Sequence, residues 1–181
     1  MRVTEQQPMV ASFEDLALPL FDQLYNFAHW LTQYRTEAED LVQETFLKAL
    51  RGFASFQAGT NFRAWIYRIL RNSFLSSRTG LKTMVALDEE GTDELPAEDM
   101  SPESLLVQEA NREMVQQALV SLPVQVREIL LLCEVEEMSY QEISETLGIP
   151  IGTVMSRLFR ARKALRAALS AQMEVGPHGV R

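Results

Sequence analysis

The chain has 181 residues, 46% of them hydrophobic, and a formal net charge of −8, which is ordinary for a globular protein of one domain or two small ones. No apolar run is long enough to span a bilayer, and the N-terminal segment lacks the apolar core of a secretory signal. A single cysteine, Cys133, and two histidines, His29 and His178, disfavour a zinc site and a disulfide framework. We therefore expect a cytoplasmic protein with no direct membrane insertion, no cofactor and no metal, in which Cys133 is a buried small hydrophobe and His29 packs in a helix.

The charge is distributed in blocks rather than evenly along the chain. Residues 45–87 contain basic side chains and no acidic one, whereas residues 88–109 contain acidic side chains and no basic one. The segment 149–169 is again basic without an acidic residue. Such patterning predicts two lobes with basic faces, joined by an acidic linker of roughly 20 residues that also carries Gly and Pro.

The hydrophobic periodicity predicts an all-α protein. Helices are expected over 12–34 with a bend at Pro19, and over 36–53, 60–78, 101–122, 124–137, 139–148 and 149–169. Several start and stop residues support these bounds: Ser12 with Asp15, Thr36 with Glu39, Thr60 or Asn61, Ser101 before Pro102, Ser139 with Glu142, and Gly52 and Gly148 as helix ends.

The segment 138–165 has the pattern of a helix-turn-helix, with Gly148, Ile149 and Pro150 in the turn. On its last helix, a stripe with helical spacing is expected to be buried: Ile151, Val154, Leu158, Ala161 and Leu165. The opposite side carries Thr153, Ser156, Phe159, Arg160 and Lys163, with Arg157 near the border. An exposed Phe among hydroxyl and basic groups is typical of a side that enters the major groove of DNA. The alternative is an amphipathic helix with a solvated basic face.

The helix over 36–53 has one apolar face and, opposite it, Asp40, Gln43, Glu44 and Leu47. A leucine among carboxylates and an amide is typical of a protein-binding patch. A solvated polar face with one stray leucine is the alternative, and these residues alone favour it.

The helix over 60–78 alternates aromatic and basic residues. Tyr67, Arg68 and Arg71 are expected to face outward, with Asn72 at the edge and Trp65 at the border of the core. Aromatic faces stack on bases while guanidinium groups follow phosphates, so the pattern indicates single-stranded nucleic acid. For Trp65, a place in the core remains the alternative.

The order of these motifs resembles a bacterial sigma factor of the extracytoplasmic-function type, in the sigma-70 family. The resemblance is carried by "AEDLVQETFLKAL", "AGTNFRAWIYRILRN" and "LPVQVREILLLCEVEEMSYQEISETLGIPIGTVMSRLFRAR", and it covers residues 12–170. It implies a sigma-2 domain over 12–82, an acidic linker over 83–101, a sigma-4 domain over 102–170 and a disordered tail over 171–181. It also implies an alternative sigma factor that directs promoter-specific initiation, and not an enzyme.

The resemblance implies roles for residues on three surfaces. Polymerase contacts on the β′ clamp helices would come from Asp40, Gln43, Glu44 and Leu47. Readers of the melted −10 element would be Phe56, Asn61, Arg63, Trp65, Arg68, Arg71 and Asn72. Readers of the duplex −35 element would be Thr153, Ser156, Arg157, Phe159, Arg160 and Lys163, while Met155 stands where some relatives carry a basic residue.

The resemblance further implies two protein partners, core RNA polymerase (including its β flap) and an anti-sigma factor, and it suggests a stress-response regulon. The acidic linker would then imitate nucleic acid in the basic channels of the polymerase, or else be a plain flexible linker. Two other functions remain open: an ordinary helix-turn-helix regulator, which would bind its site without polymerase, and a sigma mimic that sequesters an anti-sigma factor.

Overall fold

The computed structural model describes residues 11–57, 59–81 and 102–175, and within these ranges it is helical without a strand. The prediction of an all-α fold is therefore confirmed. The elements in chain order are α1 (Phe13–Ala17), η1 (Leu18–Leu20), α2 (Phe21–Thr32), α3 (Arg35–Gly52), η2 (Phe53–Ser55), α4 (Phe62–Leu81), α5 (Pro102–Ser121), α6 (Val124–Leu130), η3 (Leu131–Val135), α7 (Tyr140–Leu147) and α8 (Ile151–Val175). The predicted linker over 83–101 and most of the tail over 171–181 lie outside the described residues.

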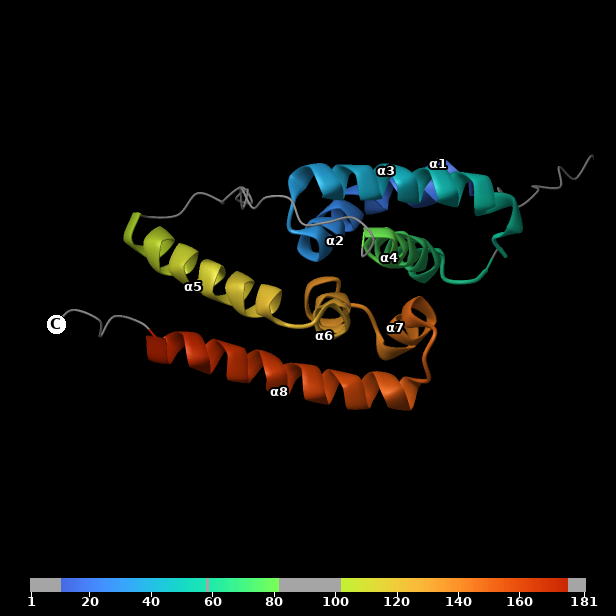
Figure 1. The fold of residues 1–181 in the computed structure, drawn as a ribbon. Coiled ribbons are helices and arrows are strands. Elements are labelled where there is room, and N and C mark those ends of the chain that lie inside the picture. The colour runs from blue at the N-terminus through green and yellow to red at the C-terminus, as the bar shows by residue number, and fades with distance from the viewer. Residues whose placement is uncertain (1–10, 58, 82–101, 176–181) are drawn as a thin grey trace, which may run out of the picture.

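The helices form two lobes, which Figure 1 shows one above the other. The first lobe contains α1 to α4, and α3 packs against both α2 and α4. Its core includes Leu24, Phe27, Ile66 and Leu70, each at most 1% exposed. Burying one such side chain stabilises a fold by roughly 1.5–3 kcal/mol, so these side chains are a main source of stability for the short helices of this lobe.

The second lobe contains α5 to α8. The long helix α8 packs along α5, α6 and α7, and it lies on the side of α7 that faces away from the first lobe (Figure 1). The buried side chains of this lobe include Ile129, Leu132, Ile143, Val154 and Leu158. α8 therefore closes the core with one face and leaves the opposite face free.

The predicted helix starts are mostly confirmed. Ser12 and Ser139 each form a capping box, with Asp15 and Glu142 respectively, and Asn61 accepts a hydrogen bond from the Ala64 backbone amide at 3.0 Å. Pro19 lies in the 3-10 turn η1, which interrupts the first predicted helix.

The predicted cap at Thr36 is wrong. α3 begins at Arg35, and Tyr34 occupies the N-cap position in an extended conformation without a side-chain cap. The cause is the tight turn from α2, in which Gln33 adopts a left-handed φ of 68° and Thr32 donates to the Tyr34 carbonyl oxygen. Glu39 pairs with Arg35 instead, at 3.0 Å on the surface.

One turn of π-helix, η3, continues α6. The Glu136 amide donates to the Leu131 carbonyl oxygen five residues earlier, at 2.9 Å. Such a turn holds one more residue than an α-helical turn and is frequent at functional sites. It carries the chain past the end of α6 so that Glu136 lies against the first lobe.

Candidate nucleic-acid interface

The helix-turn-helix of the second lobe is formed by α7 and α8. Gly148 ends α7 with a φ of 66°, in the left-handed region that favours glycine, and Pro150 precedes α8. The Thr153 and Val154 amides donate to the Pro150 carbonyl oxygen at 2.9 and 3.0 Å. These bonds fix the start of α8, where a recognition helix contacts base edges.

The outward face of α8 carries most of the predicted −35 residues. Ser156, Phe159, Arg160 and Lys163 are exposed, Phe159 to 71%, while Thr153 and Arg157 are half-buried. Ile151, predicted to be buried, is 41% exposed, because the first turn of α8 extends past the core that begins at Val154. Sequence reasoning thus missed that Ile151, and Met155 at 54%, leave exposed apolar surface beside this face.

The predicted polymerase-contact face of α3 is open to solvent. Asp40, Gln43, Glu44 and Leu47 are all exposed, Leu47 to 54%. The structure adds apolar neighbours that sequence reasoning missed: Leu50 is 52% exposed and Phe21 is 47% exposed. Phe21 packs edge to face on Phe46 of α3, with ring centroids 5.7 Å apart, so the apolar rim extends from α3 onto α2. Leu47 and Leu50 are three residues apart on α3, so Leu47 has an exposed apolar neighbour on the same side of the helix.

An aromatic cluster holds the loop that leads into α4. Phe56 lies 5.1 Å from Trp65 and 5.3 Å from Phe62 between ring centroids, and it stacks on Phe53. Phe56 and Trp65 are both half-buried, so each ring has one side in the cluster and part of its surface free. This fits the predicted border position of Trp65.

Most of the remaining predicted −10 residues, at the start of α4 and along it, lie against the second lobe: Asn61, Arg63 and Arg71 are half-buried there, while Arg68 reaches the second lobe from an exposed position. We call this surface the α4 face and define it by Asn61, Arg63, Tyr67, Arg68 and Arg71. Asn72 is exposed beside it. The prediction that Tyr67 faces outward is wrong. Its ring packs on Phe27 of α2, with ring centroids 5.3 Å apart, and its hydroxyl group contacts Glu136 of the second lobe, so Tyr67 is 0% exposed.

Each member of the α4 face has a partner in the second lobe. The Asn61 side-chain amide donates to Glu142 Oε1 at 3.1 Å, and Arg68 donates to the Glu145 backbone carbonyl oxygen. Arg71 forms a two-pronged ion pair with Glu128, Nε to Oε2 at 2.8 Å and Nη2 to Oε1 at 3.0 Å.

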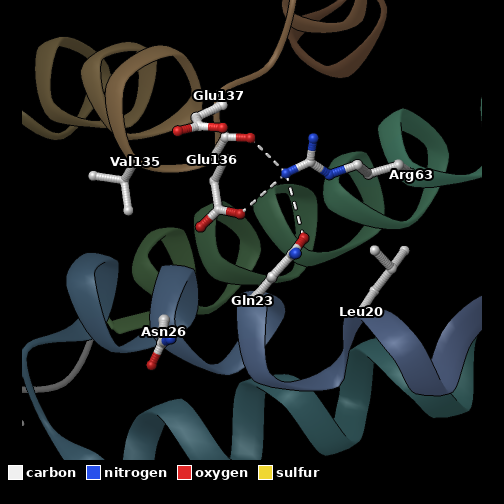
Figure 2. Close-up of a pocket in the computed structure, with 7 residues that line it drawn as sticks. All are labelled: Leu20, Gln23, Asn26, Arg63, Val135, Glu136 and Glu137. Carbon is white, nitrogen blue, oxygen red and sulfur yellow. Dashed lines mark hydrogen bonds and ion pairs between the residues drawn. The ribbon is translucent and has the colours of Figure 1, made fainter.

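Glu136 is the centre of the remaining contacts, in a polar pocket between the lobes (Figure 2). Arg63 donates to the Glu136 carbonyl oxygen at 2.6 Å and reaches its carboxylate at 3.4 Å, while Tyr67 donates its hydroxyl proton to the same carboxylate. The Arg63 Nε atom is buried there without a partner.

Burial changes the proton affinities in this pocket. It raises the pKa of Tyr67, with the Glu136 charge as a second cause, and it raises the pKa of Glu136 although Tyr67 and Arg63 oppose the shift. Tyr67 therefore stays a neutral donor.

A buried arginine joins the lobes at a second point. Arg127 donates to the carbonyl oxygens of Leu119 and Val120 at 3.0 and 2.9 Å, at the C-terminal end of α5, and to the Trp30 carbonyl oxygen of α2 at 3.2 Å. Burial lowers its pKa, with the Arg78 charge as a second cause. A cation at two helix C-termini complements the negative ends of both helix dipoles.

Four observations concern the expected absences, the lone cysteine and His29. Within the described ranges, no set of three or more His, Cys, Asp or Glu side chains is placed to hold a metal ion, and no helix there has the length and apolar content to cross a membrane. Cys133 is half-buried, less than predicted; burial and then Glu134 raise its pKa. His29 is buried, as predicted.

Comparison with known proteins agrees with this division into lobes. Residues 19–82 match the family model of Sigma-70 region 2, and residues 112–165 match that of Sigma-70, region 4. The chain is 32% identical over 166 residues to the ECF RNA polymerase sigma factor SigW of Bacillus subtilis, covering 87% of this chain and 89% of that protein. This chain belongs to the extracytoplasmic-function sigma factors. Proteins of this family are transcription initiation factors and not enzymes.

Two further relatives extend the comparison. The ECF RNA polymerase sigma factor SigE of Mycolicibacterium smegmatis is 40% identical over 169 residues, which cover 92% of this chain but only 65% of that relative's length. Among solved structures, the sigma factor RpoE in complex with the anti-sigma factor NepR from Bartonella quintana matches with a TM-score of 0.73 and 31% identity, covering 89% of this chain and 98% of that one. The match thus includes both lobes of the sigma factor. The region 2 match also distinguishes this chain from an ordinary helix-turn-helix regulator.

Proposed function

We propose that this sigma factor is a promoter-specificity subunit that binds core RNA polymerase and leaves catalysis to it. The first lobe, residues 12–82, would bind the β′ clamp helices and read the melted −10 element. The second lobe, residues 102–170, would bind the β flap and read the −35 element as duplex. The observation that carries this proposal is the presence of three distinct surfaces on one chain: the apolar and acidic face of α3, the aromatic and basic α4 face, and the basic outward face of α8.

The chemistry of each surface supports its assignment. Leu47, Leu50 and Phe21 offer exposed apolar area beside carboxylates, which suits a protein surface. Phe56 and Trp65 can stack on an unpaired base, and Arg68 and Arg71 can follow the phosphates of a separated strand. On α8, Ser156, Arg160 and Lys163 suit base edges and phosphates, while the Phe159 ring suits a thymine methyl group.

We propose an anti-sigma factor as the regulating partner, and a stress response as the context. The similarity to RpoE in its complex with NepR supports the first of these, because it extends over both lobes. The role in the cytoplasm follows from the proposed work with polymerase. The proposal that the acidic linker imitates nucleic acid concerns residues outside the described ranges.

Run-off transcription tests the proposed function. A fragment library of the source genome is transcribed by purified core polymerase with and without this protein, and the new RNA 5′ ends are mapped. New starts that share two sequence elements at a fixed spacing would support the proposal. Absence of new starts, together with binding of duplex DNA by the protein alone, would contradict it and indicate an ordinary regulator.

A further inference from the structure

The α4 face, proposed above to read the melted −10 strand, is occupied by the second lobe of the same chain. Its three guanidinium groups and its one amide are hydrogen-bonded there to Glu128, Glu136, Glu142 and the Glu145 carbonyl oxygen. Three of these partners accept through a carboxylate oxygen and Glu145 accepts through its backbone carbonyl, so all four offer oxygen acceptors. This is the chemistry that the phosphates of a nucleic acid strand would offer to the same donors.

The contact between Arg71 and Glu128 resembles phosphate binding most closely. Both carboxylate oxygens accept from one guanidinium group, at 2.8 and 3.0 Å, in the forked geometry that arginine also uses for phosphate. The Glu128 side chain is 1% exposed and the Arg71 side chain 18% exposed. A strand cannot reach Arg71 while Glu128 stays in place.

The centre of the contact, at Tyr67 and Glu136, is nearly closed to water. Tyr67 is 0% exposed, and its hydroxyl group donates to Glu136, which is 6% exposed. Leaving either group buried without its partner would cost free energy, so the lobes either stay together with all partners paired or separate and hydrate them. Two discrete states follow, rather than a gradual loosening.

The second lobe covers only one of the three surfaces that are proposed to bind partners. The predicted polymerase contacts on α3, with Leu47 54% exposed, and the −35 face of α8, with Phe159 71% exposed, remain open in the same structure. α8 lies on the far side of the second lobe from α4 (Figure 1). Only the surface proposed for the separated strand is covered.

We propose that the second lobe inhibits the α4 face in the free protein, with Glu128, Glu136 and Glu142 occupying the places of strand phosphates. This inference rests on the proposed function of the α4 face. Apparent affinity for single-stranded DNA is then reduced by the fraction of molecules that are open, whereas affinity for duplex DNA through α8 is not. Substitutions in the second lobe that weaken closure should therefore strengthen binding at a surface in the first lobe.

The first test compares E128Q with E113Q in the full chain. Both remove one negative charge, but Glu113 is exposed on α5 and lies outside the contact. The probes are a labelled random-sequence single-stranded 20-mer pool and the same pool made double-stranded, with binding followed by fluorescence anisotropy. We expect E128Q to bind the single-stranded pool about tenfold more tightly than E113Q, and both variants to bind the duplex pool within about twofold.

E136Q is the second variant, and it keeps the test valid if E128Q does not fold, which circular dichroism would reveal. It should also tighten single-stranded binding. Its effect should be smaller, because the amide oxygen of the substituted side chain can still accept from Tyr67, and the Arg63 bond to the backbone carbonyl oxygen remains. Equal affinities of E128Q, E136Q and E113Q for the single-stranded pool would overturn the inference, as would equal gains for single-stranded and duplex DNA.

An independent measurement of closure uses spin labels on both lobes. Ala54 in η2 and Ala167 in α8 are exposed, and each is replaced by cysteine in a Cys133→Ser background. Pulsed electron spin resonance should give one narrow distance distribution for the free protein and a broad one when E128Q is added. A broad distribution without E128Q would overturn the inference, while the run-off assay would still test the proposed function separately.

Discussion

Arg71 and Glu128 form a forked ion pair between α4 and α6, 57 positions apart in sequence. The pair is buried, unlike the ion pair between Arg35 and Glu39, whose side chains are 65% and 45% exposed. Buried pairs are costly to break by removing one partner, but replacing both partners can be nearly neutral. The pair therefore contributes little to the total stability, and its main effect is on whether the two lobes stay in contact or separate.

A double-mutant cycle should display this asymmetry. We expect Glu128→Leu and Arg71→Met each to lower the free energy of unfolding by at most about 3 kcal/mol, because the remaining charge either stays buried without a partner or is hydrated when the lobes separate. The double variant should lose much less than the sum of the two. Urea unfolding followed by circular dichroism measures the coupling energy, and the Arg35–Glu39 pair is the control, with an expected coupling of at most about 0.5 kcal/mol. Additive losses at Arg71 and Glu128 would contradict the prediction.

Leu47→Asp should weaken binding to core polymerase by tenfold or more. The substitution removes exposed apolar area from the α3 face and places a charge where a partner surface would exclude water. Met173→Asp is the matched control, since Met173 is 69% exposed near the end of α8, on the other lobe. Binding is measured by competition with a labelled sigma factor for core polymerase. Equal effects of the two substitutions would contradict the proposal that α3 binds the polymerase.

Lys163→Ala should weaken duplex binding about equally for all sequences. A lysine that binds a phosphate displaces one counterion, so the slope of log affinity against log salt should be less negative by about 1 in Lys163→Ala. Arg112→Ala, at an exposed position of α5, is the control for loss of a positive charge and should leave the slope unchanged. The measurement is a salt titration of binding to a −35 duplex identified by the run-off assay.

Phe159→Ala should instead change sequence preference. Its exposed ring is expected to contact a thymine methyl group rather than a phosphate, so the salt slope should stay the same. Replacing each thymine of the −35 duplex by uracil, which lacks the methyl group, should weaken wild-type binding at one position and affect F159A little there. A uniform loss across positions, with a lower salt slope, would assign Phe159 to backbone binding.

Glu142 should make stability depend on pH. Burial tends to raise the pKa of Glu142, but hydrogen bonds from the Ser139 amide and the Asn61 side chain outweigh it and hold the pKa below 4.5. The contribution of the ionised group is then complete above pH 4.5 and is lost as pH falls through the lower folded value. Glu142→Gln should therefore unfold at lower urea than wild type at pH 7, and the difference should shrink near pH 3. A difference independent of pH would mean that only the geometry of the cap matters; Glu113→Gln is the control.

Local interactions made much of the fold predictable from sequence. Ser12, Ser139 and Asn61 cap helices through contacts three residues away, and Gly148 ends α7 through its own backbone freedom. Thr36 failed as a cap because the left-handed turn at Gln33 places Tyr34 at the N-cap and starts α3 at Arg35. Ile151 failed for a related reason, since helical periodicity alone does not say where the core ends.

The contact between the two lobes could not be predicted from the local sequence patterns of either lobe. The spacing of Arg68 and Arg71 correctly placed these side chains on the side of α4 away from the first lobe's own core, whereas Tyr67 packs on Phe27 of that core. It could not show that Glu128 and Glu136, 57 and 69 positions from their partners, would cover them. Such pairs depend on the placement of two lobes joined by a long connection, and no periodicity in either lobe encodes it.

The π-helical turn η3 makes the position of Glu136 depend on chain length as well as on side-chain chemistry. The turn holds one residue more than an α-helical turn, so deletion of a single residue from 131–135 would let α6 continue as an ordinary helix and leave Glu136 facing Tyr67 and Arg63. Insertion of one further residue before Glu136 would instead rotate that side chain by about 100°, away from both partners, although every side chain of the contact were still present. The number of residues between α6 and Glu136 is therefore as important for the contact as the residues themselves.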